Sequence, residues 1–449
     1  MPPSERPEPP SRMAAFRFWL WLGCVSFGGP AGQIAVMHTE LVERRRWISE
    51  RRFLHALNYC MLLPGPEAQQ LATYIGWLLH RTWGGIVAGV LFVLPSLFIL
   101  VALAWVYLNW GQVPAVAGVF YGIKPAVTAL VIHAVWRIGS RTLRNAWLWA
   151  VAVTAFVAIF ALDVPFPAIV AAAALVGWLG ARVSPAAFTP GAGAGAHGGP
   201  VPASHAPALI DDDTPAPAHA RFSFTRLAWV LGAGVLLWLL AMGVLVAWQG
   251  WQATLTQMGW FFTKAALLTF GGAYAVLPYV YQGAVEHFQW LSGPQMIDGL
   301  ALGETTPGPL IMVVAFVGFL GGWQHQVLGP DALFAAGALA AAVVTFFTFL
   351  PSFIFILAGG PLVEASHGRL GFTAPLSAIT AAVVGVILNL ALFFAWHVWW
   401  PQGLGGRFDA LAALATGAAV FALVRWRVGV LPLIGVCALF GLGLALTGR

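Results

Sequence analysis

The sequence predicts an all-α polytopic membrane protein built from two homologous repeats, on three observations. Hydrophobic residues make up 60% of the 449 positions and charged residues only 8%, whereas a soluble domain needs roughly a quarter of its residues charged. Apolar runs of about 20 residues, the length that spans a bilayer core, recur from end to end. The third observation is an internal duplication. Together they indicate one integral membrane unit rather than several soluble domains.

The duplication is visible at a single offset. Phe27-Gly28-Gly29 recurs 243 residues later as Phe270-Gly271-Gly272, and Pro64-Gly65-Pro66 recurs at the same offset as Pro307-Gly308-Pro309. From the first motif to the second, eleven of forty aligned positions are identical without a gap. We therefore expect two structurally equivalent halves.

Composition divides the chain into four parts. Residues 1–11 form a polar, proline-rich tail, and residues 183–220 are rich in Pro, Gly, Ala and His, which is typical of a flexible linker. The first transporter-like repeat is expected at 12–182, and a linking helix followed by the second repeat at 221–449. The aspartates Asp211–Asp213 are interpreted as a solvated linker cluster rather than a metal site.

The placement of arginines indicates that the repeats are inverted. Five arginines lie between Arg44 and Arg52 in the loop after the first Phe-Gly-Gly segment, whereas the matching loop, residues 283–295, has no Lys or Arg and carries Glu286. Because cytoplasmic loops concentrate Lys and Arg, these equivalent loops are expected on opposite sides of the membrane. Almost all of the arginines fall on one side of the membrane if the segments around the Gly-Gly and Pro-Gly-Pro motifs are broken hairpins that enter the membrane and return on the same side. We therefore expect these segments to be re-entrant.

The other apolar stretches are expected to be complete spans. They lie near residues 83–107, 113–135, 145–162, 164–181, 228–248, 331–358, 373–397, 409–424 and 428–446.

Two kinds of helix break, each present twice, form the candidate binding site. Such breaks free backbone groups, which hydrocarbon tolerates only where they are buried in protein or line a polar cavity. A helix that restarts after a break offers free N–H groups and the positive end of its dipole, which suit an anion; close packing of small residues is the alternative reading. The candidate substrate-binding residues at the breaks are Gly28, Gly29, Pro64, Gly65, Pro66, Gly271, Gly272, Pro307, Gly308 and Pro309, and the neutral hydrogen-bonding candidates beside them are Gln33, Gln69, Gln70, Thr305 and Thr306.

The charged candidates lie inside apolar segments. Lys124 and Lys264 are the two lysines of the chain, and a charge at membrane depth costs at least about 2.5–3.5 kcal/mol, which marks a functional site by default. Both are therefore candidate anion ligands, with snorkelling to an interface as the alternative. Glu67 follows the first Pro-Gly-Pro and Glu304 precedes the second by three residues. Either glutamate could relay a proton for coupling or simply pair with a cation.

No cofactor, metal or nucleic acid is expected. Cys24, Cys60 and Cys437 are far apart and lack CxxC spacing, and the histidines form no ligand-spaced cluster. The net charge of +6 is concentrated in loops, where it indicates orientation in the bilayer rather than binding to a polyanion.

At these residues the sequence resembles the chromate ion transporter family, in its long two-domain form. The resemblance rests on SFGGPAGQIAVMH and WISERRFLHALNYCMLLPGPEAQQLA in one half and on TFGGAYAVLPYV and ALGETTPGPLIMVVAFVGF in the other, and it covers almost the whole chain except the tail and the linker. It implies a multi-pass protein of the bacterial inner membrane that exports chromate, driven by the membrane potential or the proton gradient, and confers chromate resistance. Sulfate or another small anion is the alternative substrate. Family members often carry an acidic residue where this chain has Gly293-Pro294, which leaves the role of that loop open.

Two other classes are weighed against a transporter. An intramembrane enzyme would need paired acids, a Ser/Lys dyad or an HExxH motif on membrane segments, and the sequence shows none of them. A channel would lack coupled transport. The sequence leaves open the preference between chromate and sulfate, the coupling ion, and whether the chain forms a homodimer.

Overall fold

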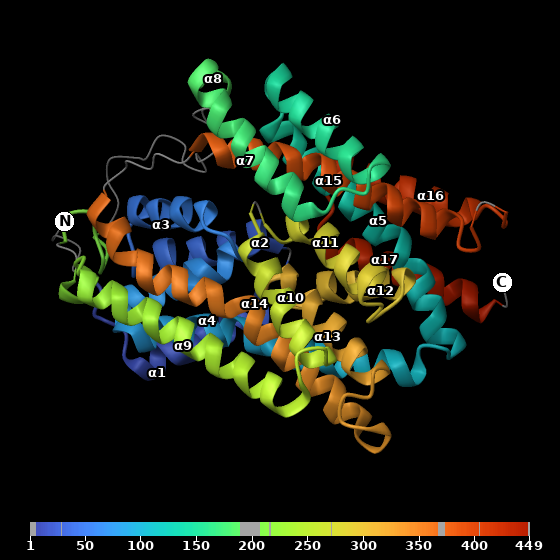
Figure 1. The fold of residues 1–449 in the computed structure, drawn as a ribbon, viewed down its shortest axis with the longest axis horizontal. Helices are drawn as coiled ribbons and strands as arrows, with labels where there is room; N and C mark the ends of the chain where they lie inside the picture. Colours follow the sequence, from blue (N-terminus) through green and yellow to red (C-terminus); the bar gives the residue numbers. More distant parts are fainter. Residues whose placement is uncertain are drawn as a thin grey trace.

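The computed structural model describes residues 6–27, 29–188, 207–214, 217–270, 272–366, 373–403 and 405–447. Within these ranges the regular elements are helices, and the β-structure is one isolated bridge between Ile48 and Ile210. Six of the described helices are long and apolar enough to cross a bilayer. The prediction of an all-α polytopic membrane protein is confirmed (Figure 1).

The helices of the two repeats follow one another in the same order on either side of an extra helix, α9 (Phe224–Gln249). The first repeat contains α1 (Arg12–Val25), α2 (Gly29–His38), η1 (Thr39–Arg44), α3 (Glu50–Leu62), α4 (Glu67–Trp110), α5 (Pro114–Thr142), α6 (Ala146–Ala161), α7 (Phe166–Val183) and the short α8 (Pro185–Phe188). The second contains α10 (Thr254–Leu267), α11 (Ala273–Tyr281), η3 (Gln282–His287), α12 (Gly293–Thr305), η4 (Leu310–Met312), α13 (Val313–Gln324), α14 (Leu333–Ser366), α15 (Thr373–Trp399), α16 (Ala410–Phe421), η6 (Ala422–Trp426) and α17 (Val430–Leu446).

Repeated sequence produces repeated local structure. The π-helical segment η3 and the helix α12 begin and end 243 residues after η1 and α3. Ser49 caps α3 by accepting a hydrogen bond from the Arg52 N–H, and its counterpart Ser292 caps α12 in the same way from Gln295. A serine at this position satisfies a backbone donor that a helix start leaves free. Because Ser49 and Ser292 are 243 residues apart, α3 and α12 begin at equivalent positions of the two repeats.

The segments around the breaks are too short to cross a bilayer singly. At 14 residues, α1 is about 21 Å long at 1.5 Å per residue, against a hydrocarbon core of about 30 Å. The long helix α4 is itself interrupted, because His80 and Arg81 have non-helical backbone angles. Its first part belongs with the hairpin elements, and the part from Thr82 onward corresponds to the span predicted to begin near residue 83.

The long equivalent helices of the two repeats pack antiparallel. Gly85 of α4 lies against Leu357 of α14, Gly89 against Phe353, and the Trp105 ring is 6.1 Å from that of Phe334. Residue numbers thus rise along one helix as they fall along the other, which is the relation that inverted repeats require. The orientation of the repeats in a bilayer stays a prediction.

The two repeats also interlock. Helix α5 packs against α16 and α17 of the second repeat, while its counterpart α15 packs against α6 and α7 of the first. Glycines allow a close approach, because any side chain at Gly122 or Gly441 would collide with the facing helix of the α5 and α17 pair. Each half therefore completes the core of the other, and neither forms an independent bundle.

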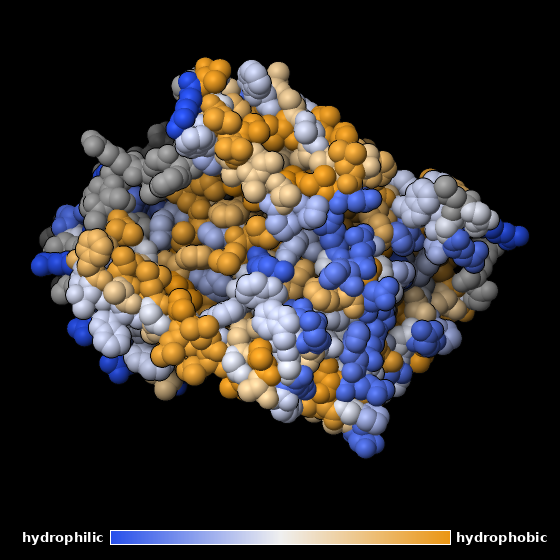
Figure 2. Space-filling view, in the orientation of Figure 1, coloured by the Kyte–Doolittle hydropathy of each residue, from blue (hydrophilic) through white to orange (hydrophobic). Residues whose placement is uncertain are grey.

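Large apolar side chains remain exposed on the outside of the molecule. Trp229 of α9 is 75% exposed and Phe160 of α6 is 61% exposed, and Figure 2 shows apolar surface over both helices. A soluble monomer does not expose apolar surface on this scale. This surface is suited to contact with lipid.

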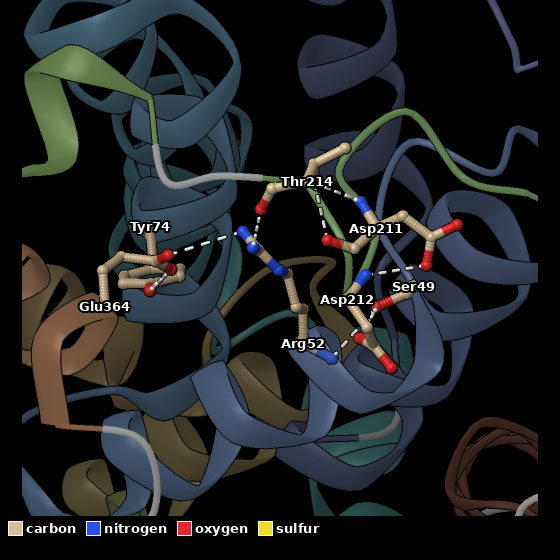
Figure 3. Close-up of polar contacts among 7 residues, drawn as sticks. All are labelled: Ser49, Arg52, Tyr74, Asp211, Asp212, Thr214 and Glu364. Atoms are coloured by element: carbon tan, nitrogen blue, oxygen red, sulfur yellow. Dashed lines mark hydrogen bonds and ion pairs between the residues drawn. The ribbon is translucent and has the colours of Figure 1, made fainter.

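The end of the predicted linker is docked on the first repeat. Residues 189–206 lie outside the described residues, but Ile210 accepts a backbone hydrogen bond from Ser49 at 2.9 Å and donates one to Trp47 at 3.1 Å. Ser49 also donates to Asp212 at 2.7 Å, and Arg52 donates to the Thr214 carbonyl at 2.5 Å (Figure 3).

Arg52 also joins this segment to α14. Its guanidinium is 3.4 Å from a Glu364 carboxylate oxygen, and the other oxygen of Glu364 accepts a hydrogen bond from Tyr74 at 2.6 Å (Figure 3). The composition of the linker did not reveal these contacts, because they depend on partners far away in the sequence.

Candidate functional site

The four helix breaks have the same backbone conformation in pairs. The residue that turns the chain at each break is a glycine with positive φ, which is 70° at Gly29, 96° at its counterpart Gly272, 127° at Gly65 and 102° at its counterpart Gly308. Residues with a side chain rarely adopt such angles. These four glycines are therefore required by the backbone path. Helix α2 begins at Gly29 and α11 directly after Gly272, whereas α4 and η4 begin directly after the second proline of each Pro-Gly-Pro motif.

The breaks of one repeat bind the breaks of the other. The Gly65 N–H donates to the carbonyl of Thr269, directly before the second Phe-Gly-Gly motif, at 2.7 Å. Equivalently, the Gly308 N–H donates to the carbonyl of Ser26, directly before the first such motif, at 2.8 Å. These two pairings are the same contact made twice, once from each repeat. They bring all four breaks into one region between the repeats.

Two equivalent serines close this region. Ser96 and Ser352 occur in the motif Leu-Pro-Ser of each repeat, 256 residues apart. Any Cβ at Gly65 would collide with the Ser352 hydroxyl, and one at Gly308 would lie 2.9 Å from the Ser96 Cβ. Both serines are buried. Glycine is thus needed at both Pro-Gly-Pro motifs for close approach as well as for backbone angle.

Polar side chains surround the paired breaks, and some of their atoms have no partner. Gln33 donates to the Gly308 carbonyl at 2.5 Å, and Gln70 donates to the Pro64 carbonyl at 2.8 Å. The carboxamide oxygens of Gln69 and Gln70 and the hydroxyl of Ser26 are fully buried without a hydrogen-bond partner among the described residues. Buried polar atoms are normally satisfied, so these three groups indicate a place where a polar ligand or water binds.

The two candidate glutamates differ in their surroundings. Glu304 is only 5% exposed and accepts a hydrogen bond from Tyr274 of α11. Glu67 begins α4 directly after the first Pro-Gly-Pro, and no hydrogen bond or ion pair of its carboxylate is found within the described part of the chain. Its position at a helix N-terminus favours a negative charge. The structure thus places one acid with a phenol partner and one at the start of a broken helix.

Lys124 has an acidic partner that the sequence analysis missed. Its ammonium nitrogen is 3.4 Å from Asp298 of α12, and the other Asp298 oxygen accepts a hydrogen bond from Tyr107 at 2.9 Å. Asp298 is 4% exposed. It lies in the apolar run MIDGLALGE, so a search for acids inside membrane segments would have found it. The pair links the second hairpin to α4 and α5.

Lys264 lies on α10 of the second repeat. Its ammonium nitrogen is 5.5 Å from the centre of the Trp260 ring, one turn earlier on α10, and no acidic partner is found within the described ranges. A cation over an aromatic face is stabilised by the ring. Lys264 is therefore the membrane lysine whose charge is not neutralised by a carboxylate.

The remaining candidates are placed as follows. The hydroxyls of Thr305 and Thr306 both donate to the Leu302 carbonyl and so close the end of α12. Gly28 and Gly271 lie outside the described residues. Pro66 directly precedes α4 and Pro309 directly precedes η4.

An acidic hollow lies at the end of the second hairpin. It has a volume of about 560 Å³ and is lined by Asp163, Glu286, His397 and several aromatic residues. Burial, and secondarily the carboxylate of Asp163, raises the pKa of Glu286. No cation lines this hollow apart from His397 in its protonated form. The corresponding loop of the first repeat carries the arginine cluster, so the two hairpin ends have opposite electrostatic character.

Comparison with known proteins gives the family. A model of the family "Chromate transporter" matches residues 13–178 and 256–442. The chain is 33% identical over 385 residues to a chromate transport protein of Pseudomonas aeruginosa, covering 85% of this chain and 80% of that one. It is 28% identical over 382 residues to the chromate transport protein of Cupriavidus metallidurans, covering 84% and 81%.

A shorter relative is about the size of one repeat. The uncharacterized transporter YwrA of Bacillus subtilis is 27% identical over 131 residues, which are 29% of this chain and 74% of that protein. No solved structure matches the chain. The matched regions contain both pairs of breaks and leave out the linker, and on this evidence the chain belongs to the chromate transporter family.

Proposed function

We propose that this protein exports chromate from the cytoplasm across the bacterial inner membrane, driven by the membrane potential or the proton gradient, and thereby confers chromate resistance. Sulfate, a dianion of the same shape, is the alternative substrate. The observation that carries the proposal is the meeting of four helix breaks, two from each repeat, around buried polar groups that lack partners.

The site suits a small tetrahedral dianion. Removing such an ion from water is costly unless hydrogen-bond donors and positive charge replace its hydration. Helix starts after Gly29, Pro66, Gly272 and Pro309 supply free N–H groups and the positive ends of helix dipoles. The Ser26 hydroxyl supplies a further donor. The NH₂ groups of Gln69 and Gln70 already donate to Thr73 and to the Pro64 carbonyl, so their free carboxamide oxygens suit water or a protonated group beside the anion.

Charge compensation in this account comes from Lys264. Lys124 is already paired with Asp298, whereas Lys264 has no carboxylate partner among the described residues. Lys264 therefore contributes net positive charge to the second repeat. Lys124 acts on the site indirectly, because its ion pair with Asp298 holds α12 in position.

Glu67 and Glu304 are the proton-coupling groups in this account. Each is close in sequence to a Pro-Gly-Pro break, and Glu304 is buried beside Tyr274. Export driven by an inward proton gradient needs exchange, in which chromate leaves and protons enter on alternate steps. A glutamate that takes up a proton outside and releases it inside can carry the protons on the return step.

The direction of transport is inferred from charge. The loop after the first hairpin carries Arg44, Arg45 and Arg46, and the corresponding hollow in the second repeat carries Glu286 and Asp163. A basic mouth raises the local concentration of anions and an acidic one lowers it. With the basic side in the cytoplasm, as the distribution of arginines predicts, anions are collected inside and released outside.

Uptake of labelled chromate and sulfate into everted membrane vesicles tests this function. Everted vesicles should accumulate chromate above vesicles that lack the protein, and an imposed potential or proton gradient should increase the rate. Accumulation of sulfate without chromate would favour the alternative substrate. Equal uptake with and without the protein would reject both.

A further inference from the structure

A groove outside the proposed transport site lies between α1 and the kink of α4. Its volume is about 570 Å³, and its lining includes Arg12, Phe16, Trp19, His80, Arg81 and Trp83. The kink itself creates the groove, because the non-helical angles of His80 and Arg81 separate the two parts of α4. Arg81 has φ of 58°, an angle uncommon for a residue with a side chain.

The groove is positively charged and its polar groups are unsatisfied. No carboxylate lines it, and neither Arg12 nor Arg81 forms an ion pair with any described residue. The Nε2 atom of His80 is buried and has no hydrogen-bond partner among the described residues. Two guanidinium groups without acidic partners suit a phosphate group, which arginine binds through several hydrogen bonds.

The rim of the groove is apolar and open. Trp83 is 76% exposed and Phe16 41%. On a membrane protein, such side chains face lipid acyl chains, and exposed Trp is typical of the interface between lipid and water. On the predicted topology, Arg12 and Arg81 lie at the cytoplasmic edge of the bilayer, where anionic lipids are attracted by basic residues.

We infer that this groove binds an anionic phospholipid, with its phosphate between Arg12 and Arg81 and its acyl chains along the exposed side of α1. A free oxyanion would use the basic groups alone, whereas a lipid also uses the apolar rim. Because α1 and the first part of α4 carry breaks that form the proposed site, a bound lipid holds these two elements together at the kink.

Thermal unfolding of the purified full-length protein tests the site. The protein is melted in neutral detergent with added phosphatidylglycerol, phosphatidylcholine or inorganic phosphate. Phosphatidylglycerol should raise the melting temperature by at least about 2 °C more than phosphatidylcholine, since a ligand stabilises the fold that binds it. The Arg12→Gln/Arg81→Gln variant should lose this difference. The matched control Arg141→Gln/Arg144→Gln should keep it, because it changes two exposed arginines at and just after the end of α5.

Three results would overturn the inference. The first is an undiminished phosphatidylglycerol effect in the Arg12→Gln/Arg81→Gln variant. The second is an equal effect of phosphatidylcholine, and the third is full reproduction of the shift by inorganic phosphate, which would make the groove a free-anion site. If the double variant does not fold, Arg12→Gln alone, on the exposed first turn of α1, should show a reduced lipid effect.

Discussion

Lys124 and Lys264 are both lysines in apolar segments, yet their surroundings give them different roles. Lys124 is 3.4 Å from the buried carboxylate of Asp298, and Lys264 lies over the Trp260 ring without an acidic partner among the described residues. The sequence cannot separate these cases, because Asp298 is 174 positions away from Lys124. Only the packing of α12 against α5 brings the two charges together.

Removing the charge of Lys264 should impair transport. In Lys264→Gln, the proposed site loses its uncompensated positive charge, so we expect chromate transport per inserted molecule to fall by about tenfold, equivalent to about 1.4 kcal/mol. Arg407→Gln, which removes an exposed loop cation, is the control and should transport normally. Parental transport by Lys264→Gln would show that this lysine is only an interfacial anchor.

Removing Lys124 should impair stability instead. Lys124→Met leaves the Asp298 carboxylate buried without its cation, and breaking a buried pair in this way costs about 3–5 kcal/mol. The melting temperature of the purified variant should therefore fall. Adding Asp298→Asn removes the orphaned charge while keeping a group that can bind Tyr107, so the double variant should recover most of the loss. An equally low melting temperature in the double variant would contradict a stabilising ion pair.

Among the elements, the four broken helices form one structural unit. The hydrogen bonds from Gly65 to Thr269 and from Gly308 to Ser26 join the Pro-Gly-Pro motif of each repeat to the Phe-Gly-Gly motif of the other. Every break therefore needs the opposite repeat to satisfy its backbone. This explains why the two motifs occur together in both halves of the sequence.

A side chain at either Pro-Gly-Pro glycine should disturb this unit. Gly65→Ala would place a Cβ against Ser352 at a φ of 127°, and a strained backbone residue costs about 1–3 kcal/mol. We expect both a lower melting temperature and slower transport, and the same for Gly308→Ala. Gly232→Ala in α9, where a Cβ meets open space, is the matched control and should leave both unchanged. Normal transport by Gly65→Ala would argue against close packing of the breaks.

Much of this architecture could be predicted from the sequence, and the reasons differ between elements. The nine expected spans coincide with helices, because length and hydropathy determine a membrane helix, although α5 and α14 continue seven and eight residues beyond their expected ends. Internal repetition of the Phe-Gly-Gly and Pro-Gly-Pro motifs marks the broken segments in the sequence alone. The pairing of Gly65 with Thr269 could not be predicted, since it depends on how two distant segments pack. The same holds for the docking of Ile210 and Asp212 on the loop before α3.

At the scale of the whole molecule, inverted repeats predict opposite membrane sides for equivalent loops. The antiparallel packing of α4 against α14 supports this arrangement. In a cysteine-free background, a cysteine introduced by Arg51→Cys should react with a membrane-impermeant maleimide only from the cytoplasmic side. One introduced by Gln289→Cys should react only from the periplasmic side of intact cells. Labelling of both from the same side would exclude the inverted arrangement.

Chromate uptake by everted vesicles that contain the Gln70→Glu protein tests whether the joined breaks of both repeats bind the anion. Gln70 is buried beside the first break, and its carboxamide oxygen has no partner among the described residues. The substitution keeps the shape of the side chain, introduces a negative charge that repels a dianion and removes the hydrogen bond to the Pro64 carbonyl beside the break. We expect at least about a tenfold loss of uptake per inserted molecule, equivalent to about 1.4 kcal/mol, while Gln402→Glu in an exposed loop transports normally. Uptake at the parental rate by a normally inserted Gln70→Glu protein would show that the anion does not bind at the joined breaks.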